Sequence, residues 1–389
     1  AHTLCCFGLS ENPMKNLPAS LSRRNFLAGA SSLGALYAAS KFAQPLPALA
    51  GPPLDDSRIA KQPIADKGWA SIRKIGDGIY ATITDRSKGL QARCNGGVIV
   101  GRDAALMIEG FQTTLASTFQ LETLRSITQV PVRAALNTHW HFDHTLGNSV
   151  YGGTGIPIWA HVDVPARMAA VYPKWQSEDL ATFLEPWEKR VREAKTDSQR
   201  EHAKSDVEGV TGMFKPVNET VLALPSHGLD PAKMPIEIDL GGTKVVVEAF
   251  IGHTDTDLIY RVPAQNIIYT GDLLTGGQYP VNINGYPTQW RATLAKFATF
   301  DKDTLFVPGH GPIMGLEGVA ELRSCFDDLA EQAEKNYKAG VPVEEAVERY
   351  VVPDRFKNYR QFSWGFAISR TTQQLYAEWS GRPVQILNY

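Results

Sequence analysis

The spacing of apolar residues along the chain changes between the two-residue period of strands and the helical period of about 3.6 residues. Short apolar runs bounded by Gly, Pro or Asn are typical of strands. In the first half of the chain such runs occupy 72–84, 95–101, 104–109, 132–136 and 156–160. In the second half they occupy 221–224, 236–240, 244–251, 258–262, 266–270 and 305–307.

Stretches with helical spacing separate these runs. Helices are predicted at 113–128, 168–175, 290–300 and 317–339, and the tail beyond them is largely helical. The charged stretch 178–207 carries Phe183, Trp187 and Val191 about four residues apart, which predicts one amphipathic helix. This helix either covers the mouth of a site or packs on the outside of the sheets, and the sequence favours neither arrangement.

Two β-rich halves, each flanked by helices, predict an α+β fold with four layers, an αββα sandwich. Residues 51–70 are rich in Pro and Asp and read as a linker. We expect one domain over 71–389, with a helical insert near 165–215 and a helical C-terminal tail.

The N-terminal 50 residues resemble a twin-arginine export signal. Ser22-Arg23-Arg24-Asn25-Phe26-Leu27 precedes a mild apolar run over 28–43, and Ala48-Leu49-Ala50 supplies small residues for cleavage. Met14 is a candidate natural start, and 1–13 would then precede the signal. The resemblance implies the twin-arginine translocation machinery as a partner and a periplasmic or secreted protein. The apolar run is too short for stable membrane insertion; the alternative is an ordinary amphipathic helix.

Composition narrows the choice of partners. The chain has 389 residues, 43% of them hydrophobic and 21% charged, as in ordinary globular proteins. The formal net charge of −2 argues against a nucleic-acid partner held by bulk electrostatics, so we expect a small-molecule substrate. Cys94 and Cys325 remain after the expected signal and are either paired or free thiols. The oligomeric state is not predicted.

The strongest chemical signal is the stretch Asn137-Thr138-His139-Trp140-His141-Phe142-Asp143-His144, which follows an apolar strand. A strand that ends in such a loop can direct several side chains at one point. Imidazole nitrogens and carboxylate oxygens suit zinc and similar divalent metals. We therefore predict a metal site here, the alternative being a polar loop whose histidines bond to the backbone.

This stretch resembles the His-x-His-x-Asp-His signature of the metallo-β-lactamase superfamily. Gly252-His253-Thr254, Gly271-Asp272 and Gly309-His310-Gly311 follow in the order of that family's later motifs. The resemblance covers about 72–315 and implies the same αββα sandwich. It also implies the ligands of two metals. The first metal would be bound by His139, His141 and His253, and the second by Asp143, His144 and His310. Asp272 would bridge both metals.

Such a ligand set would bind two divalent ions per chain, with zinc favoured and iron or manganese also compatible. Two ions about 3.5–4 Å apart can hold and activate a bridging hydroxide for attack on a carbonyl or phosphoryl centre. Asp143 can also orient this nucleophile or carry its proton. We therefore expect Asp143 and Asp272 to be catalytic as well as ligating.

Asp272 indicates which branch of the superfamily the chain resembles. Members that open β-lactams typically carry Cys or Ser at this position, whereas Asp272 resembles the glyoxalase II-like branch. The predicted substrate contacts are Trp140 and Phe142 beside the ligands, His227, and the loop residues Tyr279, Asn282 and Tyr286. His161 is expected to be a structural hydrogen-bonding residue.

The leading hypothesis is an exported dinuclear metallohydrolase that cleaves an ester, lactone or thioester bond of a small molecule. Carboxylic ester or lactone chemistry is favoured because the candidate contacts are aromatic or amide-bearing and not strongly cationic. The alternatives are a phosphodiester or sulfate ester hydrolase, β-lactamase-like activity, and a non-catalytic metal-binding protein of the cell envelope.

Overall fold

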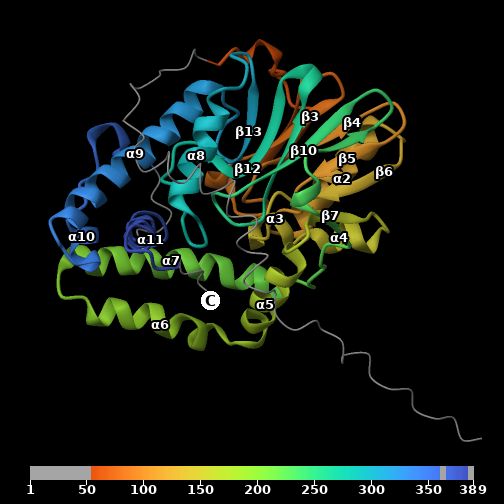
Figure 1. Ribbon diagram of the computed structural model, residues 1–389. Coiled ribbons are helices and arrows are strands. Elements are labelled where there is room, and N and C mark those ends of the chain that lie inside the picture. The colour runs from red at the N-terminus through yellow and green to blue at the C-terminus, as the bar shows by residue number, and fades with distance from the viewer. Residues whose placement is uncertain (1–53, 360–364, 384–389) are drawn as a thin grey trace, which may run out of the picture. The chain divides into compact units, whose positions relative to one another are not determined.

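Two β-sheets form the framework of the protein (Figure 1). The computed structural model describes residues 54–359 and 365–383, so the predicted export signal and Met14 lie outside the described residues. In the first sheet eight strands follow one another in chain order: β1 (Ala65–Asp66), β2 (Ala70–Gly76), β3 (Ile79–Thr84), β4 (Gly96–Val100), β5 (Ala105–Ile108), β6 (Val132–Leu136), β7 (Ile158–His161) and β8 (His227–Leu229).

The second sheet contains five strands from the second half of the described chain. Its spatial order is β13 (Leu305–His310), β12 (Ile267–Thr275), β11 (Asp257–Val262), β10 (Lys244–Phe250) and β9 (Ile236–Asp239). Strands β1 to β5 pair antiparallel, whereas β5 to β8 pair parallel. Strands β12 and β13 are also parallel. The parallel pairs matter for the site because the carboxyl ends of parallel strands meet at one edge.

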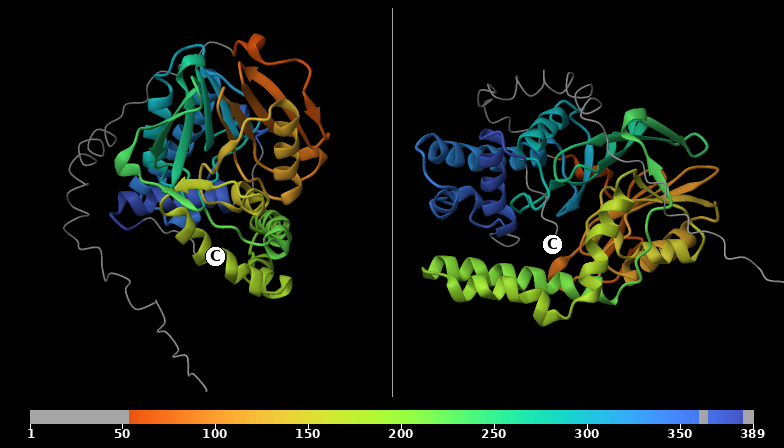
Figure 2. Two further views of the ribbon diagram at one scale, coloured as in Figure 1. Left: turned by 90° about the vertical axis from the view of Figure 1, so that its right-hand side faces the viewer. Right: turned by 60° about the horizontal axis from the view of Figure 1, so that its bottom comes forward.

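Helices connect the strands, and the chain after β13 is helical (Figures 1 and 2). The α-helices of the described residues are α2 (Thr114–Ile127), α3 (Phe142–Thr145), α4 (Asn148–Gly153), α5 (Val164–Ser177), α6 (Leu180–Glu193), α7 (Asp197–Glu219), α8 (Pro287–Phe297), α9 (Leu316–Lys338), α10 (Val343–Glu348) and α11 (Arg370–Trp379). Short helical turns are η1 (Asp56–Arg58), η2 (Arg86–Lys88), η3 (Pro231–Lys233), η4 (Pro263–Gln265), η5 (Asp354–Phe356) and η6 (Gly365–Ser369).

Alternating side chains from both sheets meet in a shared apolar core. Val245 and Val247 on β10 are buried against residues of the first sheet such as Ile99 and Leu136. The opposite face of the first sheet packs on α2 and α4 through a cluster that includes Leu124. Helices α8 and α9 cover the outer face of the second sheet. The predicted four-layer αββα sandwich is therefore confirmed.

Two local predictions differ from the structure. The single helix predicted over 178–207 is a pair, α6 and α7, which is interrupted at 194–196 because Thr196 caps a new helix and accepts a hydrogen bond from Gln199 N. The strand predicted at 221–224 is absent from this part of the described chain. Val221 is exposed there, and pairing with β7 begins only at Ser226, whose N–H donates to Ile158 O.

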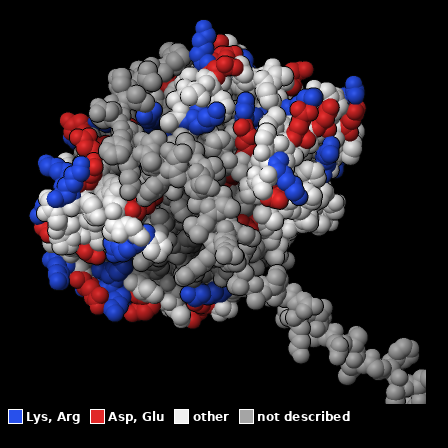
Figure 3. Space-filling view, viewed as in Figure 1, with Lys and Arg blue, Asp and Glu red and all other residues white. Residues whose placement is uncertain are grey.

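Charged side chains of both signs are interspersed over the described residues of the face in Figure 3. This mixture agrees with the net charge of −2 for the chain. Among the helices within 54–359 and 365–383, none has both the length and the apolar character that a bilayer span requires. Cys94 and Cys325 are free, buried thiols.

Candidate metal centre

Four segments bring titratable side chains to one edge of the sandwich. His139, His141, Asp143 and His144 lie in the turn after β6 and in the short helix α3. His253 lies in the turn after β10, Asp272 lies on β12, and His310 ends β13. The first segment belongs to the eight-stranded sheet and the other three belong to the five-stranded sheet, so the site spans both sheets.

All seven residues that the sequence proposed as metal ligands converge. Candidate ligand atoms lie within 4.8 Å of one another in three sets: His139, His141 and His253; His139, His144 and Asp272; and Asp143, His144 and His310. The first and third sets correspond to the two predicted metal positions. Asp272 lies between them, because its Oδ2 is 3.4 Å from His253 Nε2 and 3.2 Å from His310 Nε2.

In each of the five histidines, the ring nitrogen that points away from the cluster faces an oxygen atom. His141 Nε2 lies 3.0 Å from Asn284 Oδ1, and His253 Nδ1 lies 3.0 Å from Val281 O. His310 Nδ1 lies 3.0 Å from Arg93 O. The remaining two pairs are His139 Nδ1 with Thr138 Oγ1 at 3.0 Å and His144 Nδ1 with Glu109 Oε1 at 3.1 Å.

This pattern fits metal binding. An acceptor behind an imidazole keeps the proton on the rear nitrogen and leaves the front nitrogen as a lone-pair donor, as in known histidine sites. The front atoms His253 Nε2 and His141 Nδ1 then face each other at 2.8 Å as two acceptors. His139 Nε2 and Asp272 Oδ1 are buried without a hydrogen-bond partner. A cation between these atoms would satisfy them all.

The electrostatics of three of these side chains favour the same conclusion, whereas nearby acidic groups outweigh burial and raise the pKa of His144 and His310. Burial lowers the pKa of His139 well below its usual value and lowers that of His253 to about 3, so both imidazoles are neutral. Burial by itself would raise the pKa of Asp272, but the histidines around it, His310 first, outweigh burial and hold this pKa well below its usual value. Neutral imidazoles and an ionised carboxylate are the forms that bind cations.

Backbone geometry supports the close approach of the ligands. Any side chain at Gly309 would place its Cβ 1.9 Å from Asp272 Oδ1. Glu109 has a φ of 74°, a conformation that non-glycine residues rarely adopt. This conformation lets its carboxylate accept a hydrogen bond from Thr138 Oγ1 at 2.5 Å while it faces His144. Such strain is concentrated at functional sites.

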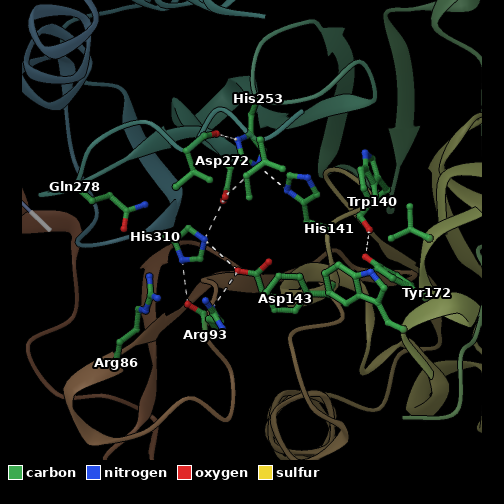
Figure 4. Close-up of a pocket in the computed structure, with 15 residues that line it drawn as sticks. Arg86, Arg93, Trp140, His141, Asp143, Tyr172, His253, Asp272, Gln278 and His310 are labelled. Carbon is green, nitrogen blue, oxygen red and sulfur yellow. Dashed lines mark hydrogen bonds and ion pairs between the residues drawn. The ribbon is translucent and has the colours of Figure 1, made fainter. Parts of the chain in front are cut away.

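A pocket opens beside the cluster (Figure 4). Trp140 and Phe142, two predicted substrate contacts, line it. Trp140 also packs under α5, where Tyr172 Oη donates to its carbonyl oxygen at 2.5 Å, so this residue both lines the pocket and supports the loop. Asp143, Asp272 and His310 line the same pocket and give it direct access to the candidate ligands.

The other predicted substrate contacts do not line the pocket. His227 is exposed on β8, where its ring packs on Trp159. Tyr279 is fully buried and its hydroxyl bonds to that of Tyr350 at 3.1 Å. Asn282 is also buried and donates to Thr371 Oγ1 at 3.0 Å, while Tyr286 precedes α8 and is partly buried. Side-chain direction in this loop depends on tertiary packing, which the sequence pattern does not report. His161 lies outside the cluster, and its Nδ1 accepts a hydrogen bond from Asp163 N at 3.2 Å.

Sequence reasoning missed the polar residues that do line the pocket. Arg86 and Arg93 come from the connection between β3 and β4, and Gln278 comes from the loop after β12. The premise that the pocket lacks strong positive charge is therefore wrong. Arg86 and Arg93 belong to no recognisable motif, so the sequence pattern gives no sign that they line a site. Asn284, the acceptor behind His141, and Glu109, whose carboxylate faces His144, were missed for the same reason.

The four-layer sandwich with a histidine–aspartate cluster at one edge is the arrangement of a protein that can hold metal ions there. A model of the metallo-beta-lactamase superfamily matches residues 91–310, more than half of the chain, and the protein belongs to that superfamily. Members of the superfamily are mostly hydrolases, and they bind divalent metal ions, often zinc.

Solved structures similar to this chain include the metallo-beta-lactamase FIM-1 from Pseudomonas aeruginosa in its mono-zinc form. It is 17% identical, with a TM-score of 0.47, and the match covers 70% of this chain and 97% of that one. A metallo-beta-lactamase from Pontibacter korlensis is 15% identical with a TM-score of 0.43, over 68% and 98% of the two chains. Comparison with curated proteins gives no match.

Proposed function

We propose that the protein is an exported dinuclear metallohydrolase of the glyoxalase II-like branch that cleaves an ester, lactone or thioester bond of a small molecule. The observation that carries this proposal is the convergence of seven side chains, in which oxygen atoms face the rear nitrogens of all five histidines. When bound, two divalent ions, with zinc favoured, would supply an activated water and an electrophile for the substrate oxygen.

The residues of the chain would then position and exchange protons. His139, His141 and His253 would hold one ion, and Asp143, His144 and His310 the other, with Asp272 in contact with both sets. Asp143 lines the pocket, and its Oδ2 lies 3.4 Å from His310 Nε2. This carboxylate can orient the attacking water and take its proton.

Two alternatives are less well supported by the site. Asp272 occupies the position where β-lactam-opening members typically carry Cys or Ser, so β-lactamase activity would be at most a side reaction. A purely metal-storing protein would not need an open pocket that reaches Asp143 and Asp272. A phosphodiester or sulfate ester hydrolase stays the second candidate, because the guanidinium groups of Arg86 and Arg93 suit tetrahedral anions.

A substrate panel with metal-replete protein tests the proposal. Chromogenic carboxylic esters, lactones, thioesters, phosphodiesters, aryl sulfates and a cephalosporin are assayed together with elemental analysis of the same sample. We expect about two metal ions per chain and turnover of the carboxylic ester or lactone. His253→Ala should reduce kcat/KM at least ~100-fold and lower the metal content, whereas the matched surface variant His227→Ala should change neither.

The panel separates the alternatives. Faster turnover of a phosphodiester or aryl sulfate would replace the leading proposal with the second candidate. Full metal loading with no hydrolysis of any substrate would favour the metal-binding protein. Export is proposed from Arg23 and Arg24; N-terminal sequencing of the protein from the periplasm or medium would show whether the first 50 residues are removed.

A further inference from the structure

The two ends of the pocket differ in chemical character (Figure 4). Arg86 and Arg93 lie on the side of His310, whereas Trp140 and Tyr172 lie on the side of His141. The only acidic residues that line this pocket among the described residues are Asp143 and Asp272, and both face histidines of the cluster. Arg86 and Arg93 bring two guanidinium groups to this end of the pocket, where bound cations would neutralise Asp143 and Asp272.

Arg93 is fixed towards this end by several contacts. Its side chain is 3% exposed, and its Nη1 donates to Gln112 Oε1 at 3.2 Å. The guanidinium lies over the ring of Phe142, 5.1 Å from the ring centroid, and Nε is 3.9 Å from Asp143 Oδ2. The backbone has a φ of 63° and its carbonyl accepts from His310. This guanidinium therefore lies next to the candidate ligands without being one of them.

The opposite wall is apolar and equally well ordered. Val171, Tyr172 and Trp175 lie within two turns of α5 and are buried in one cluster. The hydroxyl of Tyr172 is engaged by Trp140 O, so the ring presents apolar surface to the pocket. Ile283 from the loop after β12 completes this wall. An aryl or alkyl group placed here would be stabilised by roughly 0.8 kcal/mol per buried methylene.

We propose that the pocket selects an amphiphilic anion, an ester or lactone that carries a carboxylate held by Arg86 and Arg93 and an apolar group against the α5 wall. This inference rests on the proposed function and adds a substrate class to it. The carboxylate is assigned to a position beside the scissile bond, because Arg93 adjoins Asp143 from outside the ligand set. Guanidinium groups bind carboxylates with charge-assisted hydrogen bonds.

Paired substrates of equal length test the proposal. The 4-nitrophenyl monoester of glutaric acid carries a carboxylate where 4-nitrophenyl valerate carries a methyl group. We expect the metal-loaded protein to favour the glutarate monoester by at least about tenfold in kcat/KM. Arg86→Gln should lower this preference about tenfold, while the control variant Arg102→Gln, on the exposed β4–β5 turn, should leave it unchanged.

The variants are chosen so that folding does not confuse the result. Arg86 is only half-buried, so Arg86→Gln is the main test. Arg93→Lys keeps the positive charge but loses the forked set of guanidinium N–H donors, so it should retain part of the preference for the glutarate monoester. Thermal melting checks that each variant is folded. Equal kcat/KM for the two esters in the wild type, or an unchanged preference in folded Arg86→Gln, would overturn the anion site.

Binding distinguishes failure of this inference from failure of the proposed function. If neither ester is hydrolysed, the proposed function fails, and calorimetric titration of the metal-loaded protein with 5-phenylvalerate then decides the anion site. A dissociation constant raised about tenfold or more in Arg86→Gln supports the site, and an unchanged constant rejects it. Preference for 4-nitrophenyl sulfate that depends on Arg86 would show that the bound anion is the reacting group, and would overturn the assignment of a separate carboxylate.

Discussion

At the scale of single residues, a metal-binding histidine is defined by both of its ring nitrogens. The front nitrogens of His139, His141 and His253 converge, but the sequence already placed these residues in motifs. The structure adds the oxygen atoms that face the rear nitrogens, which the sequence motifs did not reveal. Asn284 holds His141 from a segment 143 positions away along the chain. Such partners fix the tautomer and the direction of each ligand.

Asn284→Ala should weaken metal binding. The variant removes the Oδ1 acceptor behind His141, so the ring is free to turn and the proton is no longer held on Nε2. We expect the affinity for Zn²⁺ to fall about 10- to 100-fold, as measured by competition with a chromophoric chelator. Asn284→Asp, which keeps an oxygen acceptor at this position, should restore most of the affinity.

A matched substitution controls for the loss of any asparagine. Asn358 is exposed and lies outside the site, so Asn358→Ala should bind Zn²⁺ like the wild type. Equal affinity in wild type and Asn284→Ala would mean that the hydrogen bond does not orient His141.

At the scale of elements, the loop after β12 joins the candidate metal centre to the C-terminal helix. This loop supplies Val281 O to His253 and is tied to α11, because Asn282 donates to Thr371 Oγ1 and Arg370 Nη2 donates to Ile283 O at 3.3 Å. Helix α11 is in turn tied to the start of α8. Thr288 Oγ1 donates to Glu378 Oε2 between these helices. The helical tail therefore supports residues that orient the ligands.

The contact between α8 and α11 should make stability depend on pH. Burial raises the pKa of Glu378 from 4.5 to about 7, partly opposed by the hydrogen bond from Thr288. Between pH 4.5 and 7 the folded state therefore holds a proton that the unfolded chain releases, so this contribution to stability is largest below pH 4.5 and is lost as the pH rises to about 7. The free energy of unfolding measured in urea across this range should fall more steeply in the wild type than in Glu378→Gln.

Other groups also titrate in this pH range, so the effect of Glu378 is the difference between the wild-type profile and the Glu378→Gln profile. Glu344→Gln removes an exposed carboxyl on α10 and should follow the wild-type profile. Parallel profiles for wild type and Glu378→Gln would show that Glu378 titrates normally.

At the scale of the whole domain, the candidate ligands join the two sheets. His139 and His144 follow a strand of the eight-stranded sheet, whereas Asp272 and His310 belong to the five-stranded sheet. Ions bound between them would link the sheets at one edge in the folded state only. Metal binding should therefore appear as folding stability.

Removal of metal should lower the melting temperature. At a free Zn²⁺ concentration about 100 times the dissociation constant, one site contributes about 2.7 kcal/mol, which corresponds to a shift of several degrees for a domain of this size. Differential scanning calorimetry with Zn²⁺ and with EDTA measures the shift. His227→Ala should retain it, and His253→Ala should lose much of it. Identical melting temperatures under both conditions in the wild type would contradict a metal bound at this edge.

The sequence by itself determined the layers of the fold and the seven candidate ligands. Strand and helix periods are local, so the αββα order could be predicted from runs such as 104–109 and 132–136. The ligands His139 to His144 stand together in one motif, and His253, Asp272 and His310 each lie in a glycine-flanked motif of the family.

Only the tertiary structure decided which other side chains face the site. Tyr279 and Asn282 belong to the expected loop but are buried against the C-terminal helices, whereas Gln278 from the same loop lines the pocket. Arg93 reaches Asp143 across a separation of 50 positions along the chain. A strand period fixes which residues alternate, but the direction of a loop side chain depends on the packing around it. That physical difference explains why the seven candidate ligands were predictable and the rest of the pocket was not.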